Sequence, residues 1–421
     1  MLRILYICDC LPHPPTSGGR QRTNVLLRAL RGYGETDFVH VARDGAVFHG
    51  LAEDCRERYG MVASVEPRAR GTYFPWKLVR PVAVKSVDRV ATAIGSRRVY
   101  YRADEGVKAV VDRLMAENKY DLVVGRYLVP TAMSGVLDYA DRLPIVLDLD
   151  DVDHLVANEK GSGSMPLLRR VALTYQRRQI SAAATPLLEK AAHLWATAGE
   201  DAEAIGAVRA SVLPNIPFIE NDDRREWAPS SEKSQDILLV ATIGYAPNRE
   251  SVERFIKSVW PRIVSACPGA RLRIVGEGMR EGEKKRWGNV GGVEAVGFVR
   301  EIASEYQRAA FCIVPVSRGG GTKIKAVECF AFNRTCVVTP HGHRGIGDVL
   351  KDRESLWRAE NDNAFVEGCV YLLKHPGERN QMAAHGRRLV DEHYSFENFQ
   401  RIVGETLRRV GFFEGTAEMV V

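Results

Sequence analysis

Two series of short apolar segments, each followed by a helical pattern, constrain the fold of this chain more than any other feature. The first series places candidate strands at residues 3–8, 38–41, 120–125, 144–150 and 193–197. The second places them at residues 237–241, 272–276, 293–298, 311–316 and 335–339. Strands that are apolar along their whole length are typical of parallel sheets covered by helices on both faces. The sequence therefore predicts two doubly wound, Rossmann-like α/β domains.

A polar stretch between the two series predicts a domain boundary. Residues 216–235 are rich in Pro, Asp, Glu, Arg and Ser and lack an apolar period, which is typical of a linker. We therefore expect a first domain over residues 1–215 and a second over residues 236–390, followed by one more helical pattern within residues 391–421. The length of 421 residues suits two cores. Ligands of such domains bind at the carboxyl ends of the strands, in a cleft between the sheets.

Charge and composition exclude several classes of protein. The chain has 59 Lys and Arg residues and 53 Asp and Glu residues, which gives a net charge of +6. This small excess argues against the strongly basic domain that nucleic-acid-binding proteins have. No apolar run approaches the roughly 20 residues that span a bilayer, and residues 1–8 indicate a buried strand rather than a signal peptide. The 8 cysteines lack a Cys-x-x-Cys pair, which indicates reduced, buried thiols in a cytosolic protein and no zinc site.

The glycine-rich turn within residues 317–331 is the most informative segment. Three glycines follow an apolar strand and precede a helix for which Thr322 is a candidate N-cap. Glycines let a ligand approach the backbone, and the free N–H groups of the first helical turn form an anion site. Lys323 and Lys325 lie in that turn, where the helix dipole disfavours cations. A bound anion such as a diphosphate would reverse that effect.

Two further features support this interpretation. Glu328 lies about 5 Å further along the same helix, where its carboxylate can accept hydrogen bonds from sugar hydroxyls. In the N-terminal segment, Gly18 and Gly19 precede a helix that begins with Arg20 and Arg22, which repeats the pattern. The alternatives are an ordinary strand–turn–helix with exposed lysines and a tight turn with solvated arginines.

Other candidate sites are less specific. Gly276 and Gly278 follow a strand, but residue 281 is Glu, so the dinucleotide fingerprint is incomplete and argues against nicotinamide binding. His341 and His343 are either metal ligands or part of a polar loop, and the missing third ligand nearby favours the loop.

Two polar clusters leave alternatives open. Four aspartates gather where a strand ends, and they are either a metal site or a general base, or else a satisfied turn and helix cap. They are Asp148, Asp150, Asp151 and Asp153. Residues 68–89 combine six basic residues with three aromatic ones and form either a solvated loop or a face that meets anionic membranes.

Several motifs along the chain match those of one enzyme group. In the second half they are residues 243–248, 259–261, 268–276 and 296–298 and the glycine-rich turn up to Glu328. In the first half they are Pro14 and Pro15, Gly18, Gly19 and Arg22, and residues 213–215. With these motifs, over most of its length, the chain resembles the retaining glycosyltransferases of the GT-B fold. The resemblance is to the family-four group, which includes bacterial polysaccharide and lipopolysaccharide sugar transferases.

This resemblance implies a UDP- or GDP-linked sugar donor that is held mainly by the second domain. The backbone near Phe298 and Val299 would face the base, and Glu328 would bind the ribose. The diphosphate would lie on the turn formed by Gly320, Gly321, Thr322 and Lys325, with Gly18, Gly19 and Arg22 closing over it. Such enzymes need neither a metal nor a cofactor, because helix N-termini and basic side chains stabilise the leaving diphosphate.

The chain departs from the family pattern in two places. The family commonly has two glutamates eight positions apart, and Gly320 stands at the first of these positions. A basic pair of the family is also absent, and Asn248 and Arg249 occupy that region. We therefore expect Lys323 to take over the phosphate role, and we assign the catalytic positions to Lys323, Glu328 and Asp151, with Asn248 among the donor-binding residues.

The leading interpretation is a glycosyltransferase that retains anomeric configuration and acts on a glycan or lipid-linked acceptor in surface polysaccharide biosynthesis. By resemblance, the acceptor would dock on the first domain, and the C-terminal helix would return to that domain. We expect a cytoplasmic location with weak association at the inner, anionic face of the membrane. The alternatives are a catalytically inactive GT-B subunit that binds nucleotide sugar or a partner enzyme, and another GT-B enzyme such as an epimerase or a phosphorylase.

Overall fold

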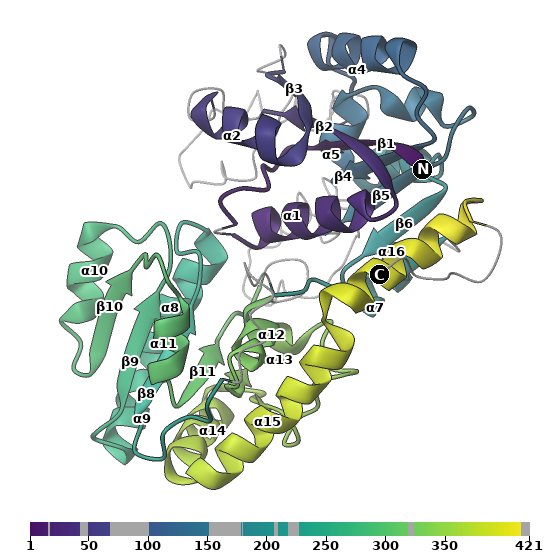
Figure 1. The fold of residues 1–421 in the computed structure, drawn as a ribbon. Helices are drawn as coiled ribbons and strands as arrows, with labels where there is room; N and C mark the ends of the chain where they lie inside the picture. The colour runs from purple at the N-terminus through teal and green to yellow at the C-terminus, as the bar shows by residue number, and fades with distance from the viewer. Residues whose placement is uncertain are drawn as a thin grey trace. The chain divides into compact units, whose positions relative to one another are not determined.

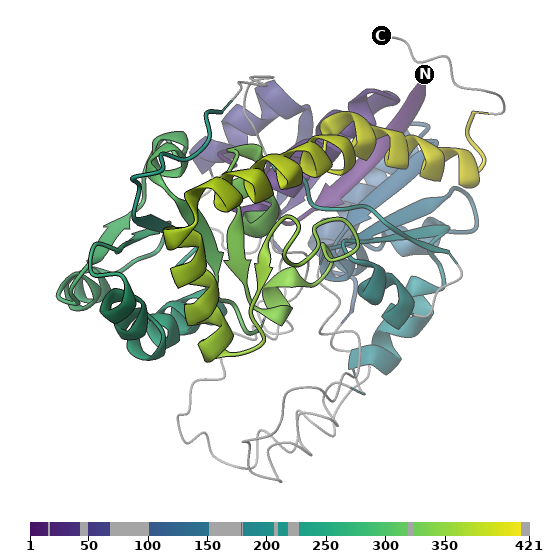
Figure 2. The same cartoon turned by 90° about the horizontal axis from the view of Figure 1, so that it is seen from below.

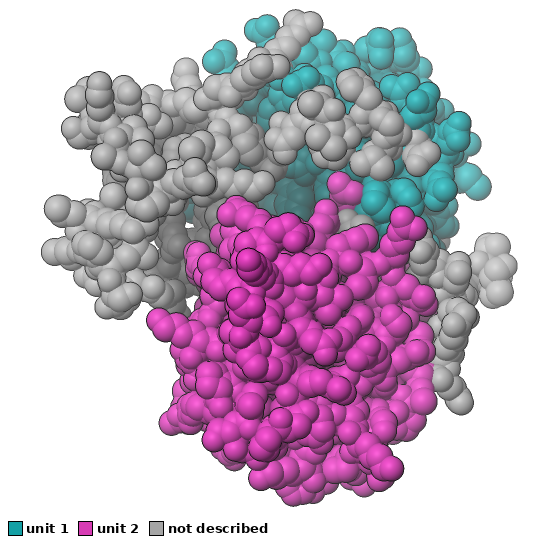
Figure 3. All heavy atoms as spheres, turned by 90° about the vertical axis from the view of Figure 1, so that its left-hand side faces the viewer, with its two compact units in different colours: residues 1–15, 22–213, 400–421 teal, residues 16–21, 214–399 magenta. Residues whose placement is uncertain are grey.

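Each half of the chain builds a parallel sheet in the computed structural model (Figure 1, and from below in Figure 2). The structure describes residues 1–15, 17–42, 49–67, 101–150, 178, 180–205, 209–217, 227–318 and 324–413. Contacts divide the chain into a first unit, residues 1–15, 22–213 and 400–421, and a second unit, residues 16–21 and 214–399 (Figure 3). Helix α1 and helix α16 therefore each contain residues of both units.

Within its described residues, the first unit has seven parallel strands in the order β3-β2-β1-β4-β5-β6-β7. The strands are β1 (Leu2–Cys8), β2 (Gly34–Val41), β3 (Met61–Val65), β4 (Leu122–Arg126), β5 (Ile145–Leu149), β6 (His193–Ala196) and β7 (Ala210–Val212). The helices are α1 (Gly18–Arg31), α2 (His49–Tyr59), α4 (Glu105–Glu117), α5 (Leu128–Met133), the 3-10 helix η2 (Val136–Tyr139), α7 (Gly199–Ile205) and α16 (Phe396–Arg409). Strands β4 and β5 are buried at every position, as expected for a sheet covered on both faces.

The part of the second unit that the structure describes has six parallel strands in the order β10-β9-β8-β11-β12-β13. They are β8 (Asp236–Val240), β9 (Arg271–Val275), β10 (Val293–Gly297), β11 (Phe311–Val314), β12 (Cys336–Val338) and β13 (Trp357–Arg358). The helices are α8 (Ala246–Ser258), α9 (Trp260–Ala266), α10 (Glu281–Gly288), α11 (Ala303–Arg308), α12 (Ile324–Ala331), α13 (Pro340–His343), α14 (Asp362–Lys374) and α15 (Pro376–His393). The prediction of two doubly wound α/β sheets is thus confirmed.

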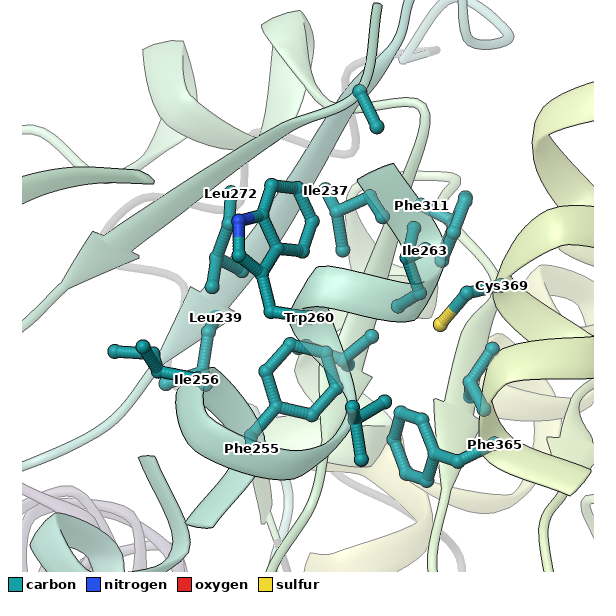
Figure 4. Packing of buried hydrophobic residues seen from close by; sticks show 14 of the residues in the cluster. Ile237, Leu239, Phe255, Ile256, Trp260, Ile263, Leu272, Phe311, Phe365 and Cys369 are labelled. Carbon is teal, nitrogen blue, oxygen red and sulfur yellow. The ribbon is translucent and has the colours of Figure 1, made fainter. Parts of the chain in front are cut away.

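The core of the second unit lies between its sheet and helices α8, α9 and α14 (Figure 4). Trp260 is fully buried, and its indole N–H donates a hydrogen bond to the carbonyl oxygen of Gly291 at 2.9 Å. The rings of Phe255 and Phe365 meet edge to face with their centroids 5.5 Å apart. Helices α14 and α15, yellow-green in Figure 2, contact β12, β13 and α12.

A break at Val259 divides the helix that the apolar pattern predicts over residues 249–266. The structure has α8 up to Ser258 and α9 from Trp260, with Pro261 in the first turn of α9. Proline lacks the N–H that would continue the hydrogen-bond ladder, and its ring clashes with the preceding turn. Proline is tolerated at the start of a helix, so the chain begins a new helix there.

Two buried arginines fix the segment that enters the second unit. Arg334 donates hydrogen bonds to the carbonyl oxygens of Ala228 at 2.9 Å and Ala309 at 2.8 Å. Arg379 donates to Ser230 Oγ and to the carbonyl oxygen of Ser231, both at 2.9 Å. Burial, together with the nearby charge of Arg334, lowers the pKa of Arg379 to about 10. The side chain therefore remains a cation at neutral pH.

Helix α16 is amphipathic, and its residues from Gln400 onward belong to the first unit. The Trp195 indole N–H donates to Thr406 Oγ1 at 2.8 Å, and the Tyr33 hydroxyl donates to the carbonyl oxygen of Gln400 at 2.8 Å. Val403 and Leu407 are fully buried. The helix thus supplies apolar side chains to the core of the first unit, although the rest of that unit ends at residue 213 and the helix joins it only from residue 400.

The cysteines agree with the expectation of reduced, buried thiols. All 8 cysteines are free thiols, and all but Cys10 are buried. None of the helices in the described ranges is both long and apolar enough to cross a membrane.

We predict that Leu407→Ala lowers the free energy of unfolding by about 2–5 kcal/mol, because it removes a fully buried side chain and leaves a cavity. Urea denaturation of the full chain measures this change. Arg408→Ala, at an exposed position of the same helix, is the control and should change the value by less than about 0.5 kcal/mol. Equal effects of the two substitutions would contradict the packing of α16.

Candidate functional site

A pocket lies where the strand order of the second unit reverses. The chain builds β8, β9 and β10 outward in one direction and then places β11 on the other side of β8. Ligands of open α/β sheets bind beyond the carboxyl ends of the strands at such a point. The pocket has a volume of about 190 Å³. The polar side chains on its wall are those of Thr242, Tyr245, Asn248, Ser251, Arg318 and Lys325, and Gly18 also lines it.

Two interlocked loops support one side of the pocket. The backbone N–H groups of Ile243 and Gly244 both donate to the carbonyl oxygen of Glu277, at 2.7 and 3.2 Å. Gly276 has φ +149°, and a Cβ atom there would lie 1.7 Å from the carbonyl oxygen of Ala241. Glycine is therefore required for this close approach of β8 and β9. The pair Gly276 and Gly278 serves loop packing.

The lysine and the glutamate predicted on one helix meet in an ion pair. Lys325 Nζ lies 2.8 Å from Glu328 Oε2, with exposed fractions of 24% for the lysine side chain and 6% for the glutamate. The Tyr306 hydroxyl donates to the same oxygen at 3.0 Å. Lys325 lines the pocket and Glu328 lies one turn behind it on α12. This arrangement combines a cation at the pocket wall with a carboxylate that is held in place.

The remaining donor-binding candidates of the second half fall into two groups. Asn248 lines the pocket and donates through Nδ2 to the carbonyl oxygen of Thr242 at 3.0 Å. Phe298 and Val299 follow β10, and Phe298 is 58% exposed, which is unusual for a large apolar side chain. Five other candidates lie outside the described residues: Asp151, Gly320, Gly321, Thr322 and Lys323.

Helix α1 begins at Gly18 rather than at Arg20, so both glycines of the N-terminal turn lie in its first turn. Gly18 lines the pocket and lies in the segment that groups with the second unit. Gly19 is half-buried in the first turn of the same helix. The basic aromatic segment of residues 68–89 lies outside the described residues.

The side chain of Arg22 is buried in the first unit. Its guanidinium forms an ion pair with Asp148 and donates Nε–H to Oδ2 at 2.9 Å, and the two side chains are 1% and 0% exposed. Burial alone would lower the pKa of Arg22, but the charge and hydrogen bonds of Asp148 outweigh this effect and raise it. Arg22 therefore belongs to the polar centre of the first unit, and its role at the donor stays a prediction.

Asp148 and Asp150, two of the four clustered aspartates, belong to the same polar centre. Arg126, which is fully buried, donates to Asp148 Oδ2 at 3.1 Å and to Asp150 Oδ2 at 2.8 Å. Tyr127 has φ +63°, which is strained for a residue with a side chain, and its hydroxyl donates to Asp150 at 3.0 Å. Asp148 and Asp150 are thus paired with cations, as in the satisfied-turn alternative. Asp151 and Asp153 lie outside the described residues.

The two histidines lie in the short helix α13. Thr339 caps helix α13 by accepting the backbone N–H of Gly342 at 3.0 Å. The ring Nε2 of His343 lies 2.6 Å from the carbonyl oxygen of Leu350. No set of three or more His, Cys, Asp or Glu side chains within the described ranges is arranged to hold a metal ion. The polar-loop interpretation is the one that these contacts favour.

The sequence reasoning missed three residues that shape these sites. Arg318 lines the pocket and forms an ion pair with Glu250, and its position between β11 and the three glycines is a signal that could have identified it. Tyr306 and Arg126 contact the site residues from other strands and helices. No local pattern marks these two, since their partners lie 22 or more positions away.

Comparison with protein families identifies the region that contains the pocket. Residues 234–375 match the family described as Glycosyl transferases group 1, and they include every pocket residue except Gly18. The second unit therefore carries a group 1 glycosyltransferase domain. A search of curated proteins finds no match to the sequence.

Solved structures show the fold of the whole chain. Sucrose-phosphate synthase from Thermosynechococcus elongatus superposes with a TM-score of 0.64 at 15% identity, covering 97% of this chain and 99% of that chain. Anabaena Alr3699/HepE in complex with UDP gives a TM-score of 0.62 at 11% identity, covering 97% and 100%. A mutant of S. aureus TarM in complex with Fondaparinux, alpha-GlcNAc-glycerol and UDP gives 0.63 at 10% identity, covering 98% and 100%. These similarities confirm the predicted GT-B fold.

We predict that Asp148→Asn lowers the free energy of unfolding by about 3–5 kcal/mol, because it leaves two buried arginines without their shared carboxylate. Denaturation in urea at neutral pH tests this. The control is Glu405→Gln, which breaks the exposed pair with Arg401 and should cost less than about 1 kcal/mol. A loss for Asp148→Asn as small as that of the control would show that the buried pairs add nothing to stability.

Proposed function

We propose that the chain is a glycosyltransferase that takes a sugar from a UDP- or GDP-linked donor and transfers it to a hydroxyl group with retention of anomeric configuration. The observation that carries the proposal is the Lys325–Glu328 pair on α12, beside a pocket at the switch point of a group 1 glycosyltransferase domain. The UDP bound in the Anabaena HepE and S. aureus TarM structures supports a nucleotide donor. Sucrose-phosphate synthase supports a hexose as the group transferred.

In this proposal, separate groups of the second unit bind the base, the ribose and the diphosphate of the donor. The exposed ring of Phe298 and the backbone at Val299 face the base, and Glu328 accepts hydrogen bonds from the ribose hydroxyls. Lys325 lies 2.8 Å from that carboxylate and next to the pocket, so its ammonium group can contact ribose and diphosphate sides alike. Gly18, Gly19 and Asn248 complete the donor site together with the turn that contains Gly320, Gly321 and Thr322.

The reaction would require stabilisation of the negative charge that develops on the leaving diphosphate. The bond between the anomeric carbon and the phosphate oxygen breaks, the acceptor oxygen bonds to the same face of the sugar, and the acceptor proton ends on the diphosphate. We assign this task to Lys325, in the first turn of α12, and to Lys323, which precedes that helix in the sequence, and their contribution is electrostatic. Asp151 is assigned to the acceptor side. We propose that no metal ion and no cofactor take part, so chelators should leave the rate unchanged.

The acceptor and the setting of the reaction belong to the same proposal. We infer a glycan or lipid-linked acceptor in the biosynthesis of surface polysaccharide, with the enzyme in the cytoplasm. The S. aureus TarM complex contains alpha-GlcNAc-glycerol and Fondaparinux, which are both glycosides, and this supports an acceptor of the carbohydrate class. The basic residues within 68–89 would give weak, salt-sensitive association with anionic membrane surfaces.

One sequence feature favours a second candidate function, that of a catalytically inactive subunit that binds a nucleotide sugar or a partner enzyme. Gly320 occupies the position of the first of the two glutamates that the resembling family commonly carries. Incubation with UDP- and GDP-sugars and a panel of glycan and lipid-linked acceptors separates the two functions. Release of nucleotide that depends on an acceptor supports the enzyme, whereas binding without turnover under any acceptor supports the inactive subunit.

We predict that Glu328→Gln weakens the binding of both the nucleoside diphosphate and the free nucleoside by about ten-fold or more. A hydrogen bond to a charged group contributes roughly 1.5–3 kcal/mol, and the neutral amide loses this strength. Lys325→Met should reduce the affinity for the diphosphate about ten-fold and affect the nucleoside much less. Calorimetric titration of UDP, GDP, uridine and guanosine measures all four affinities.

The controls are Glu367→Gln and Lys374→Met, which are the same substitutions at exposed positions of helix α14. Both should leave nucleotide affinity unchanged. Affinities equal to those of the unaltered protein in Glu328→Gln and Lys325→Met would reject the site, as would a failure of the unaltered protein to bind any of the four ligands.

A further inference from the structure

Tyr306 is a buried residue whose hydroxyl is directed at the carboxylate of Glu328. It lies in the short helix α11, is 1% exposed, and donates to Glu328 Oε2 at 3.0 Å. Buried tyrosine hydroxyls need a hydrogen-bond partner, and here the partner is an acidic side chain on a different helix. Neither the family match nor the sequence pattern gives Tyr306 a role.

The ring of Tyr306 is held by an aromatic stack. It lies parallel to the ring of Phe332, with a centroid separation of 4.3 Å and an interplanar angle of 8°. Phe332 in turn meets the ring of Trp227 edge to face at 5.0 Å. Stacked and edge-to-face contacts of this kind restrict ring motion and add to the stability of the packing. The hydroxyl of Tyr306 therefore has a fixed position relative to helix α12.

The two oxygens of Glu328 are not equivalent. Oε2 accepts from the Tyr306 hydroxyl and from Lys325 Nζ, at 3.0 and 2.8 Å. No residue that the structure describes donates a hydrogen bond to Oε1. An ionised carboxylate offers about four lone-pair positions, so two donors on Oε2 leave those of Oε1 for a ligand.

Charge keeps Tyr306 a donor rather than an acceptor. Burial, followed by the negative charge of Glu328, raises the pKa of Tyr306 well above its usual range. The hydroxyl thus stays protonated at neutral pH. A purely apolar role in the stack would be served equally well by phenylalanine, which would bury no polar atom.

We propose that Tyr306 is the positioning residue that aims Glu328 Oε1 at the two ribose hydroxyls and thereby selects ribonucleotides over deoxyribonucleotides. This inference rests on the proposed function, because it assigns a ribose to the carboxylate. With Oε2 occupied by Tyr306 and Lys325, the carboxylate cannot rotate without breaking two hydrogen bonds. A carboxylate that is held in place binds the ribose hydroxyls without first losing conformational freedom. It therefore discriminates against ligands that lack these hydroxyls more strongly than a mobile carboxylate does.

The test compares the dissociation constants of a nucleoside diphosphate and its 2′,3′-dideoxy form. UDP and GDP are both titrated into the unaltered protein, and the one that binds is used with its dideoxy analogue. We expect the unaltered protein to favour the ribose form by about ten-fold or more. Tyr306→Phe should reduce this ratio to less than about three-fold, with little change in the affinity for the dideoxy form.

Two further variants separate positioning from folding. Tyr371→Phe is the matched control, because the Tyr371 hydroxyl also hydrogen-bonds a glutamate, Glu378, at the surface of the same unit. It should leave the ratio unchanged. Glu328→Gln should lower the ratio by itself, and Tyr306→Phe should then lower it no further, as expected for residues that act through one another. Melting temperatures of all variants identify any that fail to fold, and Tyr306→Phe keeps the ring and its stack.

The outcomes are distinguishable. A ratio that falls only in Tyr306→Phe and Glu328→Gln supports the proposal. An equal loss of affinity for both ligands in Tyr306→Phe, or a lower melting temperature with an unchanged ratio, shows a structural role and overturns it. If the unaltered protein binds a nucleotide but does not favour the ribose form, this inference alone fails. If the unaltered protein binds neither nucleotide, both the proposed function and this inference are rejected.

Discussion

The parallel pairing of β8 with β11 determines where a ligand can bind in the second unit. Parallel neighbours require a helical crossover between them, so all carboxyl ends collect at one edge of the sheet. Because β9 and β10 extend to one side of β8 and β11 begins the other side, the helices that follow β8 and β11 separate at this edge. The space between them is the pocket, and the first turn of α12 supplies its cationic wall. Asn248 and Lys325, which we assign to donor binding, line this pocket, and Glu328 lies one helical turn behind Lys325.

The carboxyl edge of the first sheet has the same reversal, between β1 and β4, but buried charges occupy it. Two arginines and two aspartates are paired there, and Arg126 also donates to Thr23 at 2.6 Å. Buried pairs of this kind add little net stability compared with apolar residues, whereas the loss of one partner is costly. Their effect is to fix the ends of β4 and β5 and the start of α1. The glycine turn that precedes Arg22 is thereby anchored at its C-terminal end.

The sequence predicted the central strands well because their signal is local. Strands β4, β5, β8 and β11 are apolar at nearly every position. This pattern is typical of a parallel sheet that helices cover on both faces. The edge strands β3, β7 and β13 gave no such signal, since they are short and only partly buried. In the site, the sequence placed Lys325 and Glu328 on one helix, and their spacing of three positions accounts for the ion pair that the structure adds. The burial of Arg22 could not be predicted, because its partner Asp148 lies 126 positions away, and Tyr306 was missed because its partner Glu328 lies on a different helix.

The two units differ in how they satisfy their buried guanidinium groups, and this difference determines how each depends on individual side chains. In the first unit Arg22 and Arg126 share one carboxylate, that of Asp148. In the second unit Arg334 and Arg379 are bound mainly by backbone carbonyl oxygens, which are present whatever the side chain, and by one serine hydroxyl. The polar centre of the first unit therefore depends on the identity of a single residue, while the attachment of residues 227–231 to the second unit depends mainly on the path of the backbone.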